Sequence, residues 1–410
     1  MRSAVFKSRG RIQARRESPP GSLLERFARA LAEAGYAPST ARQHLRAAEH
    51  FIEWTDRRGM PVRNEQSLVR FDRHLSRCHC SSYAPVQKRR VVHGAHLFLA
   101  FLPDARILTQ PSGEPRVHDP ALVLAFCQWM RRQRGTGDAT LHNYSMYIRE
   151  LLGRLGEEPS RFEVRQLRTF VLEKTRSCGW GTAKNCVNAL RMFLRFLIAE
   201  GQCVVGLDAA IPTVAYWRLA SLPRYLPPSE VERLIASCDR ASAVGRRDRA
   251  ILLLLARLGL RASDIVHLRL SDIDWKDASV SVCGKGRRHT RLPLTQEVGQ
   301  AIVAYLKHGR PRTSADTVFI RARAPSCAFR TSAAVSCIVD RALRRADVRR
   351  PSRGAAHLLR HSLATSLLRQ GTSLQDIASI LRHRSLATTL IYAKVDIPSL
   401  RQIAQPWPEV

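Results

Sequence analysis

The sequence carries the same helical pattern twice in its first half. Residues 27–54 (FARALAEAGYAPSTARQHLRAAEHFIEW) align with residues 126–155 (FCQWMRRQRGTGDATLHNYSMYIRELLGRL), and LFLAFL at 97–102 matches MFLRFL at 192–197. Within each copy, apolar residues recur at the three- and four-residue spacing of an amphipathic helix. A repeat of about eighty residues with this periodicity predicts a duplicated all-α module.

The second half has a different pattern. The apolar run AILLLLA at 250–256 predicts a buried helix over 247–258. The segment SVSVCGKGRRHTRLPLT at 279–295 alternates as strand, glycine-containing turn and strand, which is typical of an antiparallel hairpin. The remainder reads as helix. The expected fold class is therefore mainly α, with two helical bundles followed by a mixed α+β domain that holds a small antiparallel sheet.

Proline-rich and polar stretches divide the chain into segments. The segment LPRYLPPSE at 222–230 precedes a helix that Ser229 is expected to cap, with Glu232 completing a capping box. The expected organisation is a flexible basic arm (1–20), a first helical module (21–103), a linker (104–118), a second helical module (119–201), a linker (202–222), a further domain (223–396) and a C-terminal tail (397–410).

The charge balance points to a polyanion as partner. Lys and Arg number 67 against 34 Asp and Glu, a formal net charge of +33. Cationic side chains displace the counterions condensed on a phosphate backbone, so such an excess favours nucleic acid. A solubilising surface or a ribosome-like scaffold would give the same balance.

Basic residues also gather on one face of two predicted helices. In the second copy, Lys184, Arg191 and Arg195 lie opposite the apolar residues Val187, Leu190, Leu194 and Leu197, and in the first copy Arg89 lies away from the apolar stripe. A solvated face is the commoner explanation of such a pattern. Together with the net charge, these four residues are predicted to contact a nucleic-acid backbone.

Several other classes of protein are disfavoured. AILLLLA is too short to cross a membrane, and the N-terminal residues lack the apolar region of a secretory signal, so a cytoplasmic, nucleoid-associated protein is expected. The ten cysteines include no CxxC pair. Cys78 and Cys80 flank His79, but this spacing without a second ligand cluster is a poor zinc signal, so reduced thiols and no metal are expected.

Four local patterns in the second half hold the candidate reactive residues. LARLGLRASDIVHLRLSDID (255–274) contains Arg261 and Asp264, and the turn GKG holds Lys285. HLLRH (357–361) places His357, Arg360 and His361 on one face of the first turn of a helix, where free N–H groups favour an anion. RHRSLATTLIYAKVD (382–396) contains His383 and, nine residues later, Tyr392, in a short helix that Ser385 is expected to cap.

Each residue alone has a structural explanation: an Arg261–Asp264 ion pair, a solvated turn lysine, a core histidine or a core tyrosine. The order Arg, Lys, HxxRH, His and Tyr is long and specific. The second half, over residues 223–396, resembles the tyrosine recombinases of the phage integrase family, and both helical repeats resemble that family's core-binding module. The family usually has one such module, and it usually has Leu-Gly-His where this sequence has Leu381, Arg382 and His383.

The resemblance implies a role for each residue. Arg261 and Arg360 would clamp a DNA phosphate, with Asp264 holding Arg261 in place. Tyr392 would attack the phosphorus to give a 3′-phosphotyrosyl intermediate, and Lys285 would protonate the leaving 5′ oxygen. His357 and His383 would donate hydrogen bonds to the phosphate, with His357 helping to move the tyrosine proton, while His361 would support and Arg382 would add a backbone contact.

The same resemblance implies the partners. These are double-stranded DNA and a homotetramer on two duplexes that passes through a Holliday junction, with companion recombinases, in a mobile element. No nucleotide cofactor or metal is implied. The C-terminal apolar residues Ile397, Leu400 and Ile403 would dock in a neighbouring subunit or pack within their own chain.

Two other functions remain open at this point. A type IB topoisomerase uses the same chemistry without synapsis, although two small helical modules favour the recombinase. A DNA-binding accessory protein without activity would keep the basic surface but would not need Tyr392. All six catalytic positions are filled, which argues against such a loss of activity.

Overall fold

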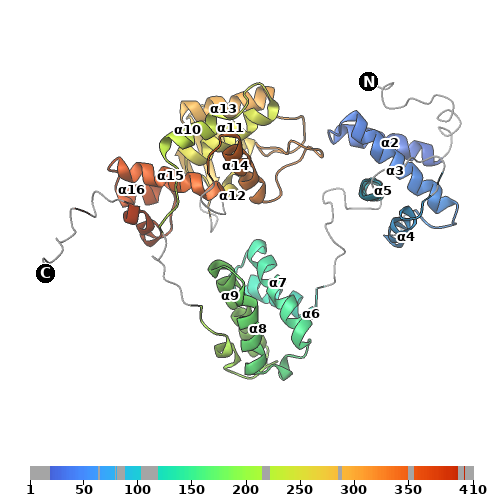
Figure 1. Ribbon diagram of the computed structural model, residues 1–410, viewed down its shortest axis with the longest axis horizontal. Helices are drawn as coiled ribbons and strands as arrows, with labels where there is room; N and C mark the ends of the chain where they lie inside the picture. The colour runs from blue at the N-terminus through green and yellow to red at the C-terminus, as the bar shows by residue number, and fades with distance from the viewer. Residues whose placement is uncertain are drawn as a thin grey trace. The chain divides into compact units, whose positions relative to one another are not determined.

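A computed structural model of the protein (Figure 1) describes residues 19–62, 65–78, 80, 88–102, 119–214, 222–284, 289–349, 355–395 and 401. The expected arm (1–20) therefore lies outside the described residues except for its last two positions, which begin a helix. The linker 104–118, Lys285 and the tail 397–410, apart from Arg401, also lie outside them.

The two predicted helical modules have four α-helices each, in the same order. The first contains α2 (Pro19–Glu33), α3 (Pro38–Asp56), α4 (Glu65–Leu75) and α5 (Lys88–Phe101). The second contains α6 (Ala121–Arg134), α7 (Asp138–Leu155), α8 (Val164–Arg176) and α9 (Trp180–Ala199), with a 3-10 turn, η1 (Pro159–Arg161), before α8. In each module the second helix packs on the first and the fourth, and the third packs on the fourth.

The cores of the modules repeat the same aromatic contacts. The rings of Phe27 and Phe98 meet edge to face at 5.3 Å, and those of Phe126 and Phe193, at the matching places of the sequence repeat, do so at 5.6 Å. The predicted apolar stripes also face the cores. Val91 is partly buried, and the other members are buried: Ala95, Phe98, Leu102, Val187, Leu190, Leu194 and Leu197. The alignment of the two copies therefore describes packing as well as sequence.

One predicted boundary is corrected. Residues 202–214 were assigned to a linker, but they contain a 3-10 helix, η2 (Leu207–Ala210), that packs on α8 and α9. Leu207 and Ile211 are buried in the core of the second module. Burial of these apolar side chains in that core stabilises the segment against α8 and α9, so the segment belongs to the second module.

The remaining domain is a helical bundle with a small sheet. Its first helices are α10 (Pro228–Ala236), α11 (Ala243–Arg257) and α12 (Ala262–His267), followed by the 3-10 turn η3 (Leu270–Asp272). The later helices are α13 (Gln296–His308), α14 (Ala333–Arg345), α15 (Ala355–Arg369) and α16 (Leu374–Ile380), and two 3-10 segments follow, η4 (Leu386–Thr388) and η5 (Leu390–Val395). Helix α11 lies at the centre of the core, where its residues 250–255 are fully buried.

The sheet has three antiparallel strands in the order β1 (Ile273–Asp274), β2 (Ser279–Cys283) and β3 (His289–Pro293). Cys283 pairs with His289 at the end of the hairpin where the β2–β3 connection begins. The predicted hairpin and the predicted fold class are both confirmed. None of the described helices is long and apolar enough to span a membrane.

Three local predictions differ from the structure. Helix α10 begins at Pro228 after Pro227, so Ser229 lies inside it and no side chain caps it, while Glu232 pairs with Arg257 at 2.8 Å. The buried helix predicted over 247–258 begins earlier, at Ala243. The predicted helix with Tyr392 is two 3-10 segments instead, and Ser385 makes no side-chain cap.

Candidate active site

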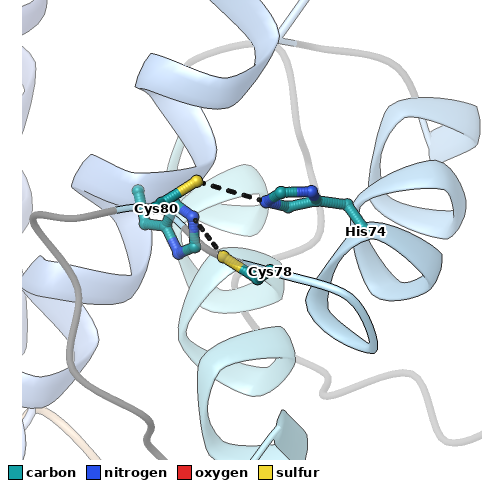
Figure 2. A group of neighbouring side chains, drawn as sticks. His74, Cys78 and Cys80 are labelled. Carbon is teal, nitrogen blue, oxygen red and sulfur yellow. Dashed lines mark hydrogen bonds between the residues drawn. The ribbon is translucent and has the colours of Figure 1, made fainter.

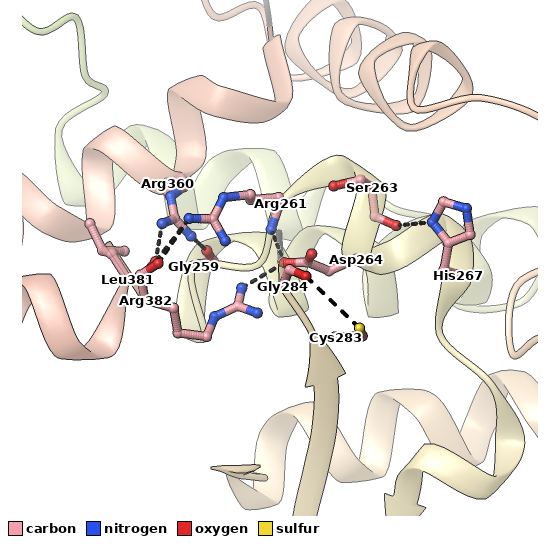
Figure 3. A network of polar contacts seen from close by, with 10 residues as sticks. All are labelled: Gly259, Arg261, Ser263, Asp264, His267, Cys283, Gly284, Arg360, Leu381 and Arg382. Carbon is pink, nitrogen blue, oxygen red and sulfur yellow. Dashed lines mark hydrogen bonds and ion pairs between the residues drawn. The ribbon is translucent and has the colours of Figure 1, made fainter. Parts of the chain in front are cut away.

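Two arginines that are far apart in the sequence meet at one backbone carbonyl. Arg360, in the second turn of α15, is 4% exposed and donates hydrogen bonds to the carbonyl oxygens of Gly259 and Leu381. Arg261, just before α12, donates from Nη2 to the same Leu381 oxygen at 3.5 Å and to the Arg382 oxygen at 3.1 Å (Figure 3). The sequence had placed Arg360 in the first turn, but only His357 lies there.

A glycine shapes one side of this meeting point. Gly259 follows α11 with φ +57°, in the left-handed region, and a Cβ at this position would lie 2.8 Å from Leu381 Cδ2. Its carbonyl accepts a hydrogen bond from Arg360. A side chain here would adopt a strained φ and would crowd the end of the Leu381 side chain, so a glycine suits the turn that presents its carbonyl to Arg360.

The carboxylate of this cluster holds a third arginine. Asp264 Oδ2 accepts a hydrogen bond from the Arg261 backbone N at 2.8 Å and forms an ion pair with Arg382 Nη2 at 2.6 Å. The resemblance implied that Asp264 holds Arg261 in place, and the contact that Asp264 makes is with the Arg261 main chain. Among the described residues, neither Arg261 nor Arg360 forms an ion pair with a carboxylate.

Arg382 replaces the glycine expected at its position, and the backbone explains the expectation. Its φ is +54°, and its N–H and that of His383 donate to the Ser379 and Ala378 carbonyls, which ends α16 in the way that a left-handed C-cap does. The buried ion pair with Asp264 compensates for part of the strain. The predicted DNA-backbone contact by Arg382 is corrected, because its side chain is buried against Asp264.

The candidate nucleophile is buried beside a histidine. Tyr392 in η5 is 1% exposed, and its hydroxyl lies 2.8 Å from His361 Nδ1. Burial raises the pKa of Tyr392 to about 12, although the charge of Arg360 opposes the increase. Burial, then the nearby His357 and Arg360, lower the pKa of His361 to about 4. At neutral pH the phenol therefore keeps its proton and faces a neutral imidazole that can accept it.

The other two histidines surround the arginines. His383 lies with Nδ1 at 2.7 Å from the Thr389 hydroxyl, and burial, then the charges of Arg360 and Arg261, lower its pKa to about 4. The ring of His357 lies 6.5 Å from that of His361, and burial of the imidazole, then the charges of Arg360 and Arg261, lower its pKa. The sequence had favoured His357 as the residue that moves the tyrosine proton, whereas His361 makes the contact with the hydroxyl.

Comparison with known proteins identifies the chain's family. Residues 224–397 match the phage integrase family. The sequence is 36% identical to a candidate integrase/recombinase of Sinorhizobium fredii, y4rA, over 96% of this chain and 95% of the relative. The tyrosine recombinase XerC of Thermodesulfovibrio yellowstonii is 28% identical over 68% of this chain and 94% of its own length. The chain belongs to the tyrosine recombinases of the phage integrase family.

Solved structures support the fold of this tyrosine recombinase. The XerH site-specific recombinase, in a post-cleavage complex with a palindromic difH substrate, aligns over 83% of this chain and 95% of its own, with a TM-score of 0.55 and 20% identity. At that identity the likeness shows the fold. The y4rA relative covers both helical modules and the domain that follows, whereas about a third of this recombinase lies outside the XerC match.

The remaining predicted residues of the recombinase differ in whether the structure describes them and in whether they already have partners within the protein. Lys285 lies outside the described residues, in the connection between β2 and β3. In the second module, Arg195 pairs with Asp208 at 2.9 Å, and Arg191 donates to the Ile211 carbonyl at 2.8 Å and to a threonine hydroxyl. Lys184 lies over the Trp180 ring at 5.1 Å, and Arg89 is exposed on α5. Basic side chains of α9 therefore already have partners within the second module.

Three features of the site were not found from the sequence. These are the Gly259 and Leu381 carbonyls that hold Arg360, and the hydroxyl of Thr389 that holds His383. Backbone acceptors carry no signal in a sequence pattern. The glycine before Arg261 was visible, and its positive φ is the reason for its place.

Proposed function

We propose that this recombinase cleaves and rejoins DNA strands at specific sites through a phosphotyrosyl intermediate at Tyr392. The observation that carries the proposal is the meeting of Arg261 and Arg360 at the Leu381 carbonyl, with a tyrosine beside Arg360 that contacts a neutral histidine. A cluster of guanidinium groups without an equal number of carboxylates is suited to bind a phosphate.

The charge of the cluster supports an anionic substrate. Arg261, Arg360 and Arg382 surround one carboxylate, Asp264, which leaves an excess of two positive charges. Burial, then the charges of the other two arginines, lower the pKa of Arg360 to about 10, so its guanidinium is still charged at neutral pH and is stabilised by an anion. Nη1 and Nη2 of Arg360 each donate to one carbonyl and carry a second N–H, which can reach a non-bridging phosphate oxygen, and Arg261 uses Nη2 for both of its carbonyls, so its Nη1 can do the same.

In the proposed reaction, the Tyr392 oxygen bonds to phosphorus while the bond from phosphorus to the 5′ oxygen breaks. The phenolic proton passes to His361 Nδ1, which lies 2.8 Å away. Lys285 supplies a proton to the leaving 5′ oxygen, and His357 and His383 donate hydrogen bonds to the phosphate. The two arginines offset the negative charge that develops in the transition state. Attack by a 5′ hydroxyl of another strand reverses the step.

Burial of the phenol adds a requirement. Tyr392 is enclosed in a small cluster with Ala364, Ile377 and Leu381 that is separate from the main core of the domain. The hydroxyl has to be presented before it can reach a phosphorus, so DNA binding is expected to displace η5. A 3-10 segment in a cluster of this size is a low-stability element that can move without unfolding the domain.

The proposed partner is double-stranded DNA, held by the two helical modules and the domain that follows. The net charge of +33 supports it, as do the DNA complexes of structurally similar recombinases such as XerH. Synapsis of two duplexes by a homotetramer, a Holliday-junction intermediate and a role in a mobile element follow from the family, and the likeness to an integrase/recombinase over 96% of the chain supports the last of these.

Covalent trapping tests the proposal. Nicked duplexes that carry the DNA flanking the protein's own reading frame, and random-sequence duplexes, are incubated with protein and separated on a denaturing gel. The expected result is a protein–DNA adduct that Tyr392→Phe abolishes. Tyr305→Phe is the matched control, since Tyr305 is equally buried in the same domain, and it should retain the adduct. No adduct under conditions where DNA binds would sink the catalytic proposal.

The same preparations separate the recombinase from a topoisomerase. A topoisomerase relaxes supercoiled plasmid that lacks a specific site, with no requirement for synapsis. This recombinase is expected to leave such a plasmid supercoiled while it forms adducts on its own site. Efficient relaxation without a site would favour the topoisomerase.

A further inference from the structure

Four metal-ligating side chains lie together in the first helical module, outside the active site. They are His50 on α3, His74 on α4, and Cys78 and Cys80 just beyond the end of α4. Figure 2 labels the last three. One ligand atom from each of the four lies within 4.8 Å of all the others. His50 is buried, and the other three side chains are partly buried.

The distances between these atoms suit a tetrahedral ion. Cys78 Sγ lies 3.6 Å from His50 Nε2, and Cys80 Sγ lies 3.6 Å from His74 Nε2. Bonds of about 2.3 Å to sulfur and about 2.05 Å to nitrogen at tetrahedral angles place S and N about 3.6 Å apart. The remaining pairs are within the 4.8 Å limit, so small movements bring all four atoms onto one ion.

We propose that His50, His74, Cys78 and Cys80 form a structural Zn²⁺ site. Two thiolates and two imidazoles without an open position are the ligand set of closed, structural zinc sites. On binding, the ion replaces the thiol protons, which pass to solvent, and no redox change is involved. The two-residue Cys spacing was a poor signal in the sequence because the other two ligands lie on helices, His50 being 28 residues before Cys78.

Aromatic neighbours hold the two imidazoles in place. The Phe71 ring contacts His50 edge to face at 5.1 Å, and the Trp54 ring stacks on His74 at 5.5 Å. The histidine rings are themselves 5.6 Å apart. These ring contacts restrict the orientations of both imidazoles, which is what a zinc site needs from the residues around its ligands.

The second module uses different chemistry between the same pair of helices. There, Glu150 on α7 and Lys174 on α8 form an ion pair at 2.6 Å, and Cys178 beyond α8 donates to the Lys174 carbonyl. These groups neutralise each other without any ligand. In the first module, the Cys78 thiol contacts His50 Nε2 and the Cys80 thiol contacts His74 Nε2, and a cation that displaces the two thiol protons would join all four groups. The ion would fasten α3, α4 and the chain at Cys80 together.

Metal analysis of the full-length, untagged protein tests this site. After gel filtration, about one zinc ion per chain is expected, released by a thiol-blocking mercurial. Replacement by Co²⁺ should give the visible bands of tetrahedral cobalt with thiolate-to-metal charge transfer. Cys78→Ser/Cys80→Ser should lose the zinc. The matched control, Cys178→Ser/Cys203→Ser, removes two partly buried thiols of the second module and should keep it.

A second measurement does not depend on the folding of a variant. Iodoacetamide labelling of the wild-type protein, read by mass spectrometry, should spare Cys78 and Cys80 until a chelator is added, with no chelator effect on Cys178. A zinc-free protein, zinc retained after Cys78→Ser/Cys80→Ser, or labelling that ignores chelator would each overturn the proposal. None of these measurements uses DNA, so the result is independent of the proposed recombination.

Discussion

The arginines of the second helical module and those of the candidate active site have opposite surroundings. In the module, Arg149 pairs with Asp119, Arg154 with Glu173 at 2.6 Å and Arg195 with Asp208 at 2.9 Å. In the active site, Arg261 and Arg360 donate to backbone carbonyls, and the one carboxylate pairs with Arg382. All these residues add to the same net charge, so the difference lies in which charges are already neutralised.

Burial gives this difference its energetic meaning. The side chains of Arg154 and Arg195 are about half exposed, and an exposed ion pair contributes about 0–1 kcal/mol to stability. Arg360 is buried among other cations, and an uncompensated buried charge is expensive. The fold therefore keeps, at Arg360 and Arg261, a cationic site that an anion stabilises. The net charge of the chain indicates the class of partner, whereas a local excess of unpaired cations indicates where that partner binds.

The largest expected effect comes from removing an active-site arginine that has no carboxylate partner, compared with removing a paired arginine of the second module. Arg360→Ala removes a buried guanidinium beside Tyr392 and should lower the rate of adduct formation on saturating nicked DNA by roughly 10³-fold. Arg195→Ala removes an arginine that Asp208 already neutralises, and its cleavage rate should match the wild type. Single-turnover gels measure both. Equal losses in the two variants would mean that pairing does not distinguish the two regions.

The next effect concerns the one carboxylate of the site. Asp264→Asn leaves Arg382 as a buried cation without its partner and should lower the free energy of unfolding of this domain by about 3 kcal/mol. Arg382→Gly added to Asp264→Asn removes that cation and suits the φ of +54°, so the double variant should be more stable than Asp264→Asn alone. Thermal unfolding measures both. A double variant less stable than the single one would contradict the ion-pair argument.

Acid should destabilise the active site in a defined range. The pKa of His361 is about 4 in the folded protein against an ordinary value of 6.5, so the unfolded chain binds the proton more readily. The contribution of neutral His361 is fully present above pH 6.5 and is lost as the pH falls toward about 4. Unfolding at a series of pH values should show this loss, and His361→Gln should reduce it.

His383 titrates in the same range and serves as the comparison, because its folded pKa is also about 4. Adduct formation separates the two histidines. His361→Gln should slow cleavage because it removes the acceptor of the phenolic proton. His383→Gln instead removes a hydrogen bond to the bound DNA phosphate. If His361→Gln cleaved at the wild-type rate at every pH, His361 would not be the proton acceptor.

The fold was largely predictable because its signals are local or periodic. The repeat at 27–54 and 126–155 predicted two bundles, and the alternation at 279–295 predicted the hairpin that forms. The errors came from context. Serine is a residue type that often caps helices, but α10 begins at Pro228, with Pro227 at its N-cap, so Ser229 lies inside the helix. Residues 202–214 look like a linker, yet tertiary burial of Leu207 and Ile211 draws them into the second module.

The candidate site was predictable as a set of residues and not as a set of contacts. Arg261 and Arg360 could be named from their order in the chain, but their shared acceptor is a carbonyl, which every residue has. Asp264 was three residues from Arg261, although its side chain reaches Arg382 across 118 residues. His50 and His74 were single histidines on helices, and only folding brings them to Cys78 and Cys80.

The smallest expected effect comes from removing a carboxylate that neutralises an arginine of the second module. Asp208→Asn leaves Arg195 without its partner on α9 and should cost only about 0.5 kcal/mol of stability, because the Arg195 side chain is half exposed and the pair is screened by salt. The released cation should strengthen nonspecific DNA binding about two- to threefold at low salt and steepen its salt dependence by about one counterion. Fluorescence anisotropy over a salt series measures both, with Asp138→Asn, which releases Arg131 on α6, as the control on another helix. Tighter DNA binding by Asp208→Asn alone would assign DNA contact to α9. Equally tighter binding by both variants would mean that the added charge acts wherever it lies on the protein. Unchanged binding by Asp208→Asn would show that Arg195 lies away from the DNA.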